Sequence, residues 1–197
     1  MSEKVEMNGE YWDSRYVNGG INLACPHVWK HIIKYFVPGN ENVLDIGCGV
    51  GLGLRLINLL HPEKKLYGVD VSELAVERVK KSLPSVFSQN ITCSKVPPLN
   101  YEDDFFNVIV CTEFIEHVKD TLFVLKEIKR VLKKEGRVLL TIPDDCLGTA
   151  KEHMHQWNFD GFNELCESVG FTCSCHRSFY VDKNADYLFM ELRIKNG

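Results

Sequence analysis

Short apolar runs alternate with amphipathic stretches along most of this chain. Five of the runs are short and rich in aliphatic residues, which is typical of parallel strands that helices cover on both faces. They lie at residues 43–46, 65–70, 90–94, 107–111 and 137–142. Two further runs, at 172–179 and 187–194, are joined by the short polar connection 181–186, so the last strand should be antiparallel. The pattern therefore predicts an α/β fold on a doubly wound, seven-stranded sheet, mostly parallel, with an antiparallel last strand.

Helical periodicity occupies the intervals between these runs. One predicted helix spans residues 53–60 and ends before Pro62, because proline stops helix propagation. Ser72 and Asp120 stand where they can cap the next two helices. A further helix, at about residues 26–36, precedes the first strand. No repeat or low-complexity linker interrupts the alternation, so we expect one domain.

Composition and charge narrow the classes of function. The chain has 197 residues, a net charge of −4 and a pI near 6.0, which gives no general electrostatic reason to bind nucleic acid or an anionic membrane. No apolar run approaches the roughly 20 residues of a membrane-spanning helix. The polar N-terminus is also unlike a signal peptide. We therefore expect neither a membrane nor a nucleic-acid partner.

The eight cysteines are scattered along the chain and form no C-x-x-C pair. Several fall inside apolar runs, where a free cysteine packs as a small hydrophobe. Cys173 and Cys175 are the one close pair. Because residues two apart share one face of a strand, we expect both to be buried thiols on one face rather than zinc ligands. Free thiols imply a reducing compartment, so the expected localisation is cytoplasmic.

The most informative stretch is a strand that runs into the glycine-rich turn 47–51 and then opens a helix. Glycine permits positive φ and close approach of a ligand, and amides at a helix start favour an anionic group. Asp70 stands 23 residues after Gly47, at the end of the second strand, where it can accept hydrogen bonds from both hydroxyls of a ribose. The dinucleotide pattern needs glycine at position 52, which is leucine, and Asp45 stands where it can help to hold an ammonium group. The expected ligand is therefore a nucleoside that bears an amino acid rather than a pyrophosphate.

Four stretches carry a resemblance to a known family: VLDIGCGVG, YGVD, FFNVIVCTEFIEHV and VLKKEGRVLLTIP. As an ordered set, over roughly residues 40–145, they resemble the motifs of class I methyltransferases that depend on S-adenosylmethionine (SAM). The resemblance implies a Rossmann-like fold, SAM as the cofactor, the glycine loop under its methionine part, Asp70 on the ribose and Val71 against the adenine. The family often has an acid after the third strand. Residues 92–95 contain none, so Ser94 or backbone groups would meet the adenine amino group instead.

The N-terminal segment YWDSRY resembles segments that fold over SAM in small-molecule methyltransferases. Tyr11 would then lie at the cofactor, and Arg15 could pair with its carboxylate. The alternative is a helix that packs its aromatic residues on the core. The full set of expected cofactor residues is Tyr11, Arg15, Asp45, Gly47, Cys48, Gly49, Gly51, Asp70, Val71, Ser94 and Glu113.

Two polar clusters follow predicted strands, at the edge where parallel sheets bind ligands. Glu113, Glu116 and His117 follow the fourth strand, and His153 and His155 follow the fifth. The E-x-x-E-H arrangement resembles that of ubiquinone-biosynthesis O-methyltransferases and small-RNA 3′-terminal methyltransferases, where it holds a divalent metal. The ligands here would be Glu113, Glu116, His117 and His155. The same residues also occur in relatives without metal, where the glutamates orient the loop. We favour this metal-free hypothesis, with His153 or His155 as the catalytic base, because histidine titrates near neutrality.

The sequence thus predicts a SAM-dependent methyltransferase that acts on a small molecule at oxygen or nitrogen. Within a single domain, 1–197, we expect an N-terminal cap at 1–38, a cofactor-binding core at 40–145, and a substrate-side loop with the final strands at 146–197. Two alternatives stay open, namely an RNA-end methyltransferase that uses a divalent metal and a non-catalytic SAM-binding subunit that regulates a partner. The acceptor and the oligomeric state stay open with them.

Overall fold

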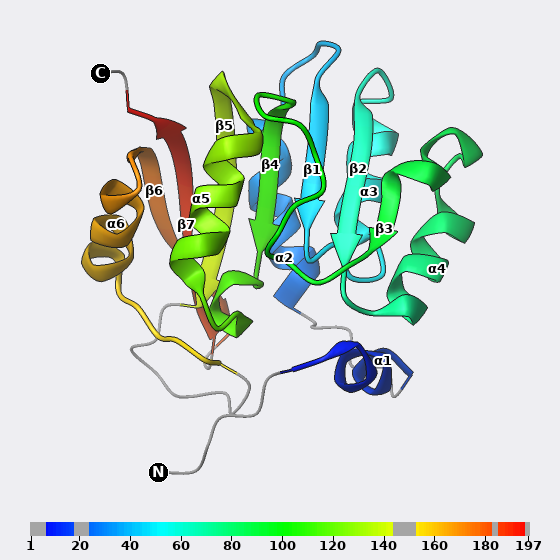
Figure 1. Ribbon diagram of the computed structural model, residues 1–197, viewed down its shortest axis with the longest axis horizontal. Helices are drawn as coiled ribbons and strands as arrows, with labels where there is room; N and C mark the ends of the chain where they lie inside the picture. Colours follow the sequence, from blue (N-terminus) through cyan, green and yellow to red (C-terminus); the bar gives the residue numbers. More distant parts are fainter. Residues whose placement is uncertain (1–6, 18–23, 144–152, 183–184, 196–197) are drawn as a thin grey trace.

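The computed structural model describes residues 7–17, 24–143, 153–182 and 185–195, and its centre is a seven-stranded sheet in the order β3-β2-β1-β4-β5-β7-β6 (Figure 1). The strands are β1 Asn42–Ile46, β2 Lys65–Asp70, β3 Ile91–Cys93, β4 Phe106–Thr112, β5 Leu132–Pro143, β6 Phe171–Asp182 and β7 Ala185–Ile194. The first five strands are parallel, and β7 lies antiparallel between β5 and β6. The predicted Rossmann-like sheet with an antiparallel last strand is therefore confirmed.

The clearest difference from the predicted strands is at the start of β5. This strand begins at Leu132 rather than at Arg137, directly after a helix. Leu132 pairs with Phe106, and after an irregularity in the register Arg137 pairs with Val108. The charged residues between the two pairs hide the early start, because they interrupt the apolar run on which the prediction depends.

Helices cover both faces of the sheet and build a core on each. One face carries α2 Ala24–Ile32 with the short helix η1 Ile33–Tyr35, α3 Leu52–Leu60 and α4 Glu73–Ser82, and the other carries α5 Thr121–Val131 and α6 Phe159–Ser168 (Figure 1). Trp29 and Leu54 pack against the first face, and Leu125 and Phe162 pack against the second. In the described ranges, no helix combines the length and the apolar character that crossing a membrane requires.

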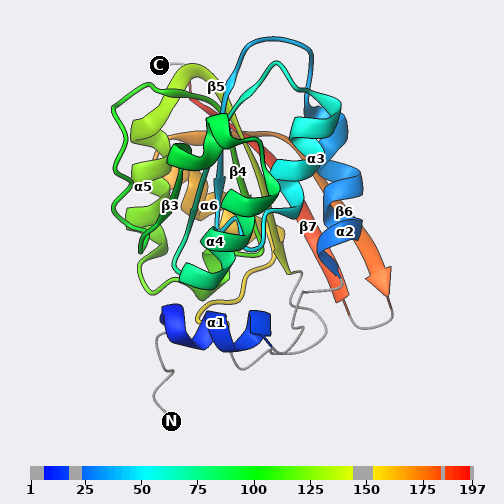
Figure 2. The same cartoon turned by 90° about the vertical axis from the view of Figure 1, so that its right-hand side faces the viewer.

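The helix boundaries follow the predicted signals closely. The Ser72 hydroxyl accepts the Ala75 amide at 3.0 Å, and Asp120 Oδ1 accepts the Phe123 amide at 2.9 Å, so both predicted caps are confirmed. The helix expected at residues 26–36 is split, because α2 gives way to the 3-10 helix η1. α1 Gly9–Val17 lies across the edge at which the parallel strands end (Figure 2).

The expectation that Cys173 and Cys175 are buried on one face of a strand is wrong. Both are half-buried, and a bulge between them makes Cys173 pair with Leu192 and Cys175 with Glu191. Cys173 therefore packs on the α5–α6 side, whereas Cys175 Sγ lies 3.6 Å from the Tyr35 hydroxyl on the opposite side. The extra residue in the bulge reverses the alternation that two residues of regular strand would keep.

Candidate functional site

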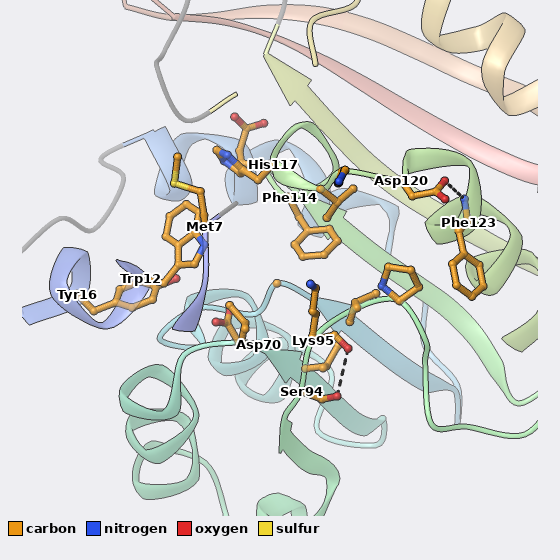
Figure 3. Close-up of a pocket in the computed structure, with 18 residues that line it drawn as sticks. Met7, Trp12, Tyr16, Asp70, Ser94, Lys95, Phe114, His117, Asp120 and Phe123 are labelled. Carbon is orange, nitrogen blue, oxygen red and sulfur yellow. Dashed lines mark hydrogen bonds between the residues drawn. The ribbon is translucent and has the colours of Figure 1, made fainter. Parts of the chain in front are cut away.

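A cavity of about 590 Å³ lies at the carboxyl edge of the sheet, between α1, the glycine loop and the segment after β4 (Figure 3). Such a volume is in the range of small-molecule sites. Figure 3 shows Tyr16 at one end and Phe123 at the other, with Phe114 and Lys95 between them. The lining residues are Met7, Trp12, Tyr16, Gly47, Val69, Asp70, Val71, Ser94, Lys95, Val96, Pro97, Glu113, Phe114, His117, Val118, Lys119, Asp120 and Phe123.

The glycine loop after β1 has a backbone conformation that favours glycine. Gly47, Gly49 and Gly51 have φ values of 70°, 50° and 79°. The Gly47 amide donates to the Val69 carbonyl at 2.8 Å, which joins the loop to β2. A Cβ atom on Gly47 would come within 2.6 Å of Phe114 Cδ2. This position therefore needs glycine for space as well as for conformation.

Asp70, at the end of β2, fixes the loop from the side. Its Oδ2 accepts the Gly49 amide at 2.8 Å, and its Oδ1 accepts the Ser72 amide at 2.9 Å. Burial raises the pKa of Asp70, and these two amides oppose the rise. Each carboxylate oxygen has two lone pairs, so Asp70 can accept further hydrogen bonds from a ligand in the cavity.

Asp45 is a buried carboxylate behind the loop. It is 2% exposed, and its Oδ1 has no hydrogen-bond partner among the described residues. Burial raises the pKa of Asp45 well above the usual value, and the charge of Asp70 adds to the rise. A buried oxygen without a donor is costly, so a donor or a positive charge bound nearby would stabilise this site.

The predicted cofactor residues divide into two groups. Those that line the cavity are Gly47, Asp70, Val71, Ser94 and Glu113, and those that do not are Tyr11, Arg15, Asp45, Cys48, Gly49 and Gly51. Cys48 is buried and packs in the core beneath the loop. The loop residues outside the lining thus shape the site rather than form its wall.

α1 turns a different face to the cavity from the one the sequence suggested. Trp12 and Tyr16 line the cavity, whereas Tyr11 and Arg15 do not. Tyr11 and Arg15 are four apart as well, so the signal for the inner face is that Trp12 and Tyr16 are both aromatic, whereas the other pair includes a charged arginine. A Cβ atom on Gly49 would lie 2.9 Å from the Tyr16 hydroxyl oxygen, so α1 lies directly over the glycine loop.

Asp13 fastens α1 to the start of α4. Its Oδ1 accepts a hydrogen bond from the Ser72 hydroxyl and another from the Leu74 amide, at 3.2 Å. The amide of Ser72 in turn donates to Asp70. The short segment 70–74 therefore connects the helix over the cavity to the carboxylate at its floor. We call this set of hydrogen bonds the Asp13 latch.

Three ionisable side chains gather at the segment after β4. Glu116, His117 and His153 each place one possible ligand atom within 4.8 Å of the others. His117 Nε2 lies 3.7 Å from Glu116 Oε1, and the rings of His117 and His153 are 5.1 Å apart. Glu116 is 1% exposed, whereas His117 lines the cavity. This histidine cluster could transfer protons or hold a divalent metal.

His155 lies outside the histidine cluster. Its Nε2 is 3.2 Å from the Lys119 carbonyl oxygen, and its ring stacks on Trp157 with centroids 5.1 Å apart. The amide of His155 and the amide before it both donate to the Glu116 carbonyl, at 3.2 and 2.7 Å. These two bonds tie the segment after β5 to the segment after β4, so His153 and His155 meet different neighbours.

Glu113 is not one of the three residues of the histidine cluster. Its Oε1 accepts the Thr141 hydroxyl at 2.9 Å, and its φ of 49° is uncommon for a residue other than glycine. The group of possible metal ligands therefore differs from the predicted one, because His153 takes the place of His155 and Glu113 is not included.

Sequence reasoning missed Lys95, Phe114 and Phe123 on the cavity wall. Phe123 is 43% exposed at the start of α5, where the amphipathic pattern assigns it to solvent. A large aromatic residue on the outer face of a capped helix is the signal that could have identified it.

Residues 44–140 match the family model of the methyltransferase domain. The ubiquinone biosynthesis O-methyltransferase of Coxiella burnetii is 26% identical to this chain over 134 residues, which cover 67% of this chain and 56% of the relative. The chain spans between 30% and 56% of the length of the first curated relatives it matches.

Two solved structures share the fold. One is the methyltransferase in a complex with the Haloferax volcanii Trm112 methyltransferase activator, with a TM-score of 0.78, 15% identity, and 94% of this chain and 98% of that chain covered. The other is the Burkholderia thailandensis 1,6-didemethyltoxoflavin-N1-methyltransferase with bound 1,6-didemethyltoxoflavin and S-adenosylhomocysteine. It has a TM-score of 0.77 and 18% identity, and 93% of this chain and 85% of that chain are covered.

Proposed function

We propose that this chain, as a member of the class I SAM-dependent methyltransferases, transfers the methyl group of SAM to an oxygen or nitrogen atom of a small molecule. The observation that carries the proposal is the cavity, which joins the glycine loop and Asp70 on one side to His117 on the other. A cofactor held by the first side and an acceptor held by the second would meet in one space.

The ribose and adenine parts of SAM fit the wall formed after β2 and β3. The Asp70 carboxylate has acceptor capacity left for the ribose hydroxyls. Val71 and Val96 offer apolar surface to the adenine ring, and Ser94 offers a hydroxyl and backbone groups to its amino group. The absence of an acid at residues 92–95 is therefore compatible with cofactor binding.

The methionine part of SAM fits the glycine loop. Amides at the start of α3 favour its carboxylate. Its ammonium group would supply the positive charge that the buried carboxylate of Asp45 lacks, and Glu113 adds a second carboxylate on the cavity wall. Tyr11 and Arg15 lie outside the lining, so we assign the covering role to Trp12 and Tyr16.

When bound, SAM supplies a methyl group on a sulfonium, and the protein mainly has to align the acceptor and exclude water. α1 covers the cavity with Trp12 and Tyr16 and so helps to keep water out of it. A hydroxyl or a protonated amine must also lose a proton, which requires a base. We assign this role to His153 acting with His117, because His117 meets the cavity and His153 lies beside it. His155, the other histidine expected as a base, is the weaker candidate, because its Nε2 donates to the Lys119 carbonyl oxygen and the residue does not line the cavity.

A small acceptor fits the size of the cavity better than a polymer does. The Coxiella relative is named as an O-methyltransferase and the Burkholderia protein as an N-methyltransferase, which supports oxygen or nitrogen as the acceptor atom.

We also propose that the segments 1–38, 40–145 and 146–197 act together as one domain. The six described cysteines are free, in keeping with a cytoplasmic protein.

Two measurements test the proposal. Calorimetry should show binding of SAM and S-adenosylhomocysteine but not of NAD, because position 52 is leucine and Asp45 precedes the loop. Incubation with methyl-labelled SAM and fractionated metabolite extracts should then yield a labelled small product, with the Asp70→Asn variant as the control. Preferential binding of NAD, or label that enters only RNA, would contradict the proposal.

A further inference from the structure

Outside the cofactor cavity, a second hollow of about 410 Å³ lies between the end of α2 with η1 and the outer strands β6 and β7. α2 lies beside these strands (Figure 2). The lining residues are His31, Lys34, Tyr35, Arg177, Ser178 and Phe189, none of which lines the cofactor cavity. We call this second site the basic hollow.

Positive charge is concentrated in the basic hollow. The pKa of His31 is lowered first by burial, and then by the charges of Lys34, Lys30, Arg177 and His27. Within the described ranges, neither Lys34 nor Arg177 forms an ion pair with a carboxylate. Because the whole chain has a net charge of −4, this is a local surplus of cations that will attract an anion.

Arg177 lies beside Tyr35 and Cys175 in the basic hollow. Cys175 and Tyr35 interact with its side chain and raise its pKa. The Tyr35 hydroxyl is itself 3.6 Å from Cys175 Sγ, and its ring lies 4.5 Å from that of Phe189, which is buried. A guanidinium has five N–H donors, so several stay available to a ligand.

We propose that the basic hollow binds a small anion in which a carboxylate or phosphate group is attached to an aromatic or other apolar body. The planar fork of Arg177 matches the oxygens of either group, and Lys34 supplies a second charge. Tyr35, whose ring packs on the buried Phe189, provides the aromatic surface for the body of the ligand. The charge lies in a hollow of small-molecule size rather than along an extended surface, so a small ligand fits better than a polymer. The site is separate from the proposed methyl transfer.

Phenyl phosphate and benzoate are suitable probes, with benzyl alcohol as the neutral control. In an NMR titration of the full chain, both anions should shift the backbone amides of residues 31–35 and 177–178 in a saturable way, and benzyl alcohol should not. Tighter binding of phenyl phosphate would identify a phosphorylated ligand, and tighter binding of benzoate would identify a carboxylic acid. No saturable shift with either anion would overturn the proposal.

Substitutions of Lys34 and Arg177, the two exposed cations of the basic hollow, give a second test of anion binding. Arg177→Gln and Lys34→Gln should each weaken anion binding by about tenfold, the scale of one hydrogen bond to a charged group. The affinity for SAM should stay unchanged, because neither residue lines the cofactor cavity. Lys126→Gln, at an exposed position on α5, is the matched control. Equal anion binding by Arg177→Gln and the unchanged chain would refute a small-anion site.

Discussion

Replacement of Asp13 by alanine should loosen α1 and weaken cofactor binding while the sheet stays folded. The Asp13 latch holds Trp12 and Tyr16 over the cavity through two hydrogen bonds to one carboxylate oxygen. A hydrogen bond to a charged group contributes about 1.5–3 kcal/mol, and solvent screening reduces this for a half-buried side chain. We therefore expect a loss of about 1–2 kcal/mol, or about 5- to 30-fold in the Kd for SAM measured by calorimetry.

Thermal unfolding separates loosening of α1 from a general loss of structure. The Ser72 hydroxyl still caps α4 through the Ala75 amide, and α1 contributes no fully buried residue, so Tm should change little. Asp13→Asn keeps an acceptor oxygen but loses the charge, and its Kd should lie between those of the alanine variant and the unchanged chain. Glu10→Ala, at an exposed position on the same helix, is the matched control. An unchanged Kd in Asp13→Ala, or an equal loss in Glu10→Ala, would refute the latch.

Three further expectations concern the glycine loop, Asp70 and the histidines. Gly47→Ala should lose SAM binding because its Cβ meets Phe114, and the added change Phe114→Ala should restore part of the affinity in the same calorimetric titration. Asp70→Asn should weaken SAM binding by about 1–3 kcal/mol. Because burial raises the pKa of Asp70 in the free protein, the affinity of the unchanged chain should fall on acidification at a pH above the ordinary aspartate pKa of about 4. The asparagine variant should show a smaller fall, since Asp45, whose pKa is also raised, is still present. His153→Gln should lower kcat more than His155→Gln does. The unchanged chain should keep its activity in the presence of a chelator. If the chelator abolishes activity and a divalent ion restores it, the histidine cluster holds a metal instead.

The cofactor side of the site could be predicted because its requirements are local. Positive φ at Gly47 and a carboxylate at the end of β2 each depend on a few neighbouring residues and on the edge of the sheet to which they lead. The apolar period gives that edge directly. The inner face of α1 needed one more step, because Tyr11 and Trp12 are both aromatic. They differ in the residue four positions later, which is the charged Arg15 for Tyr11 and the aromatic Tyr16 for Trp12.

Register irregularities could not be predicted in the same way. The bulge at Cys173 moves Cys175 to the other face of β6 without any change in the apolar pattern. The early start of β5 depends likewise on pairing between Leu132 and Phe106 across the sheet. An extra residue in a strand is specified by its partner strand, and that information is absent from a local window of sequence.

The acceptor side of the site could be predicted in part. The alternation of strands and helices places the segments after β4 and β5 at one edge, so the meeting of Glu116 with a histidine from residues 153–155 follows from topology. Which histidine turns inward does not follow, since residues two apart in an extended segment would share one face. Two consecutive amides donate to the Glu116 carbonyl and bend the chain between His153 and His155. One backbone carbonyl therefore decides that His153 joins the histidine cluster and that His155 stacks on Trp157 instead.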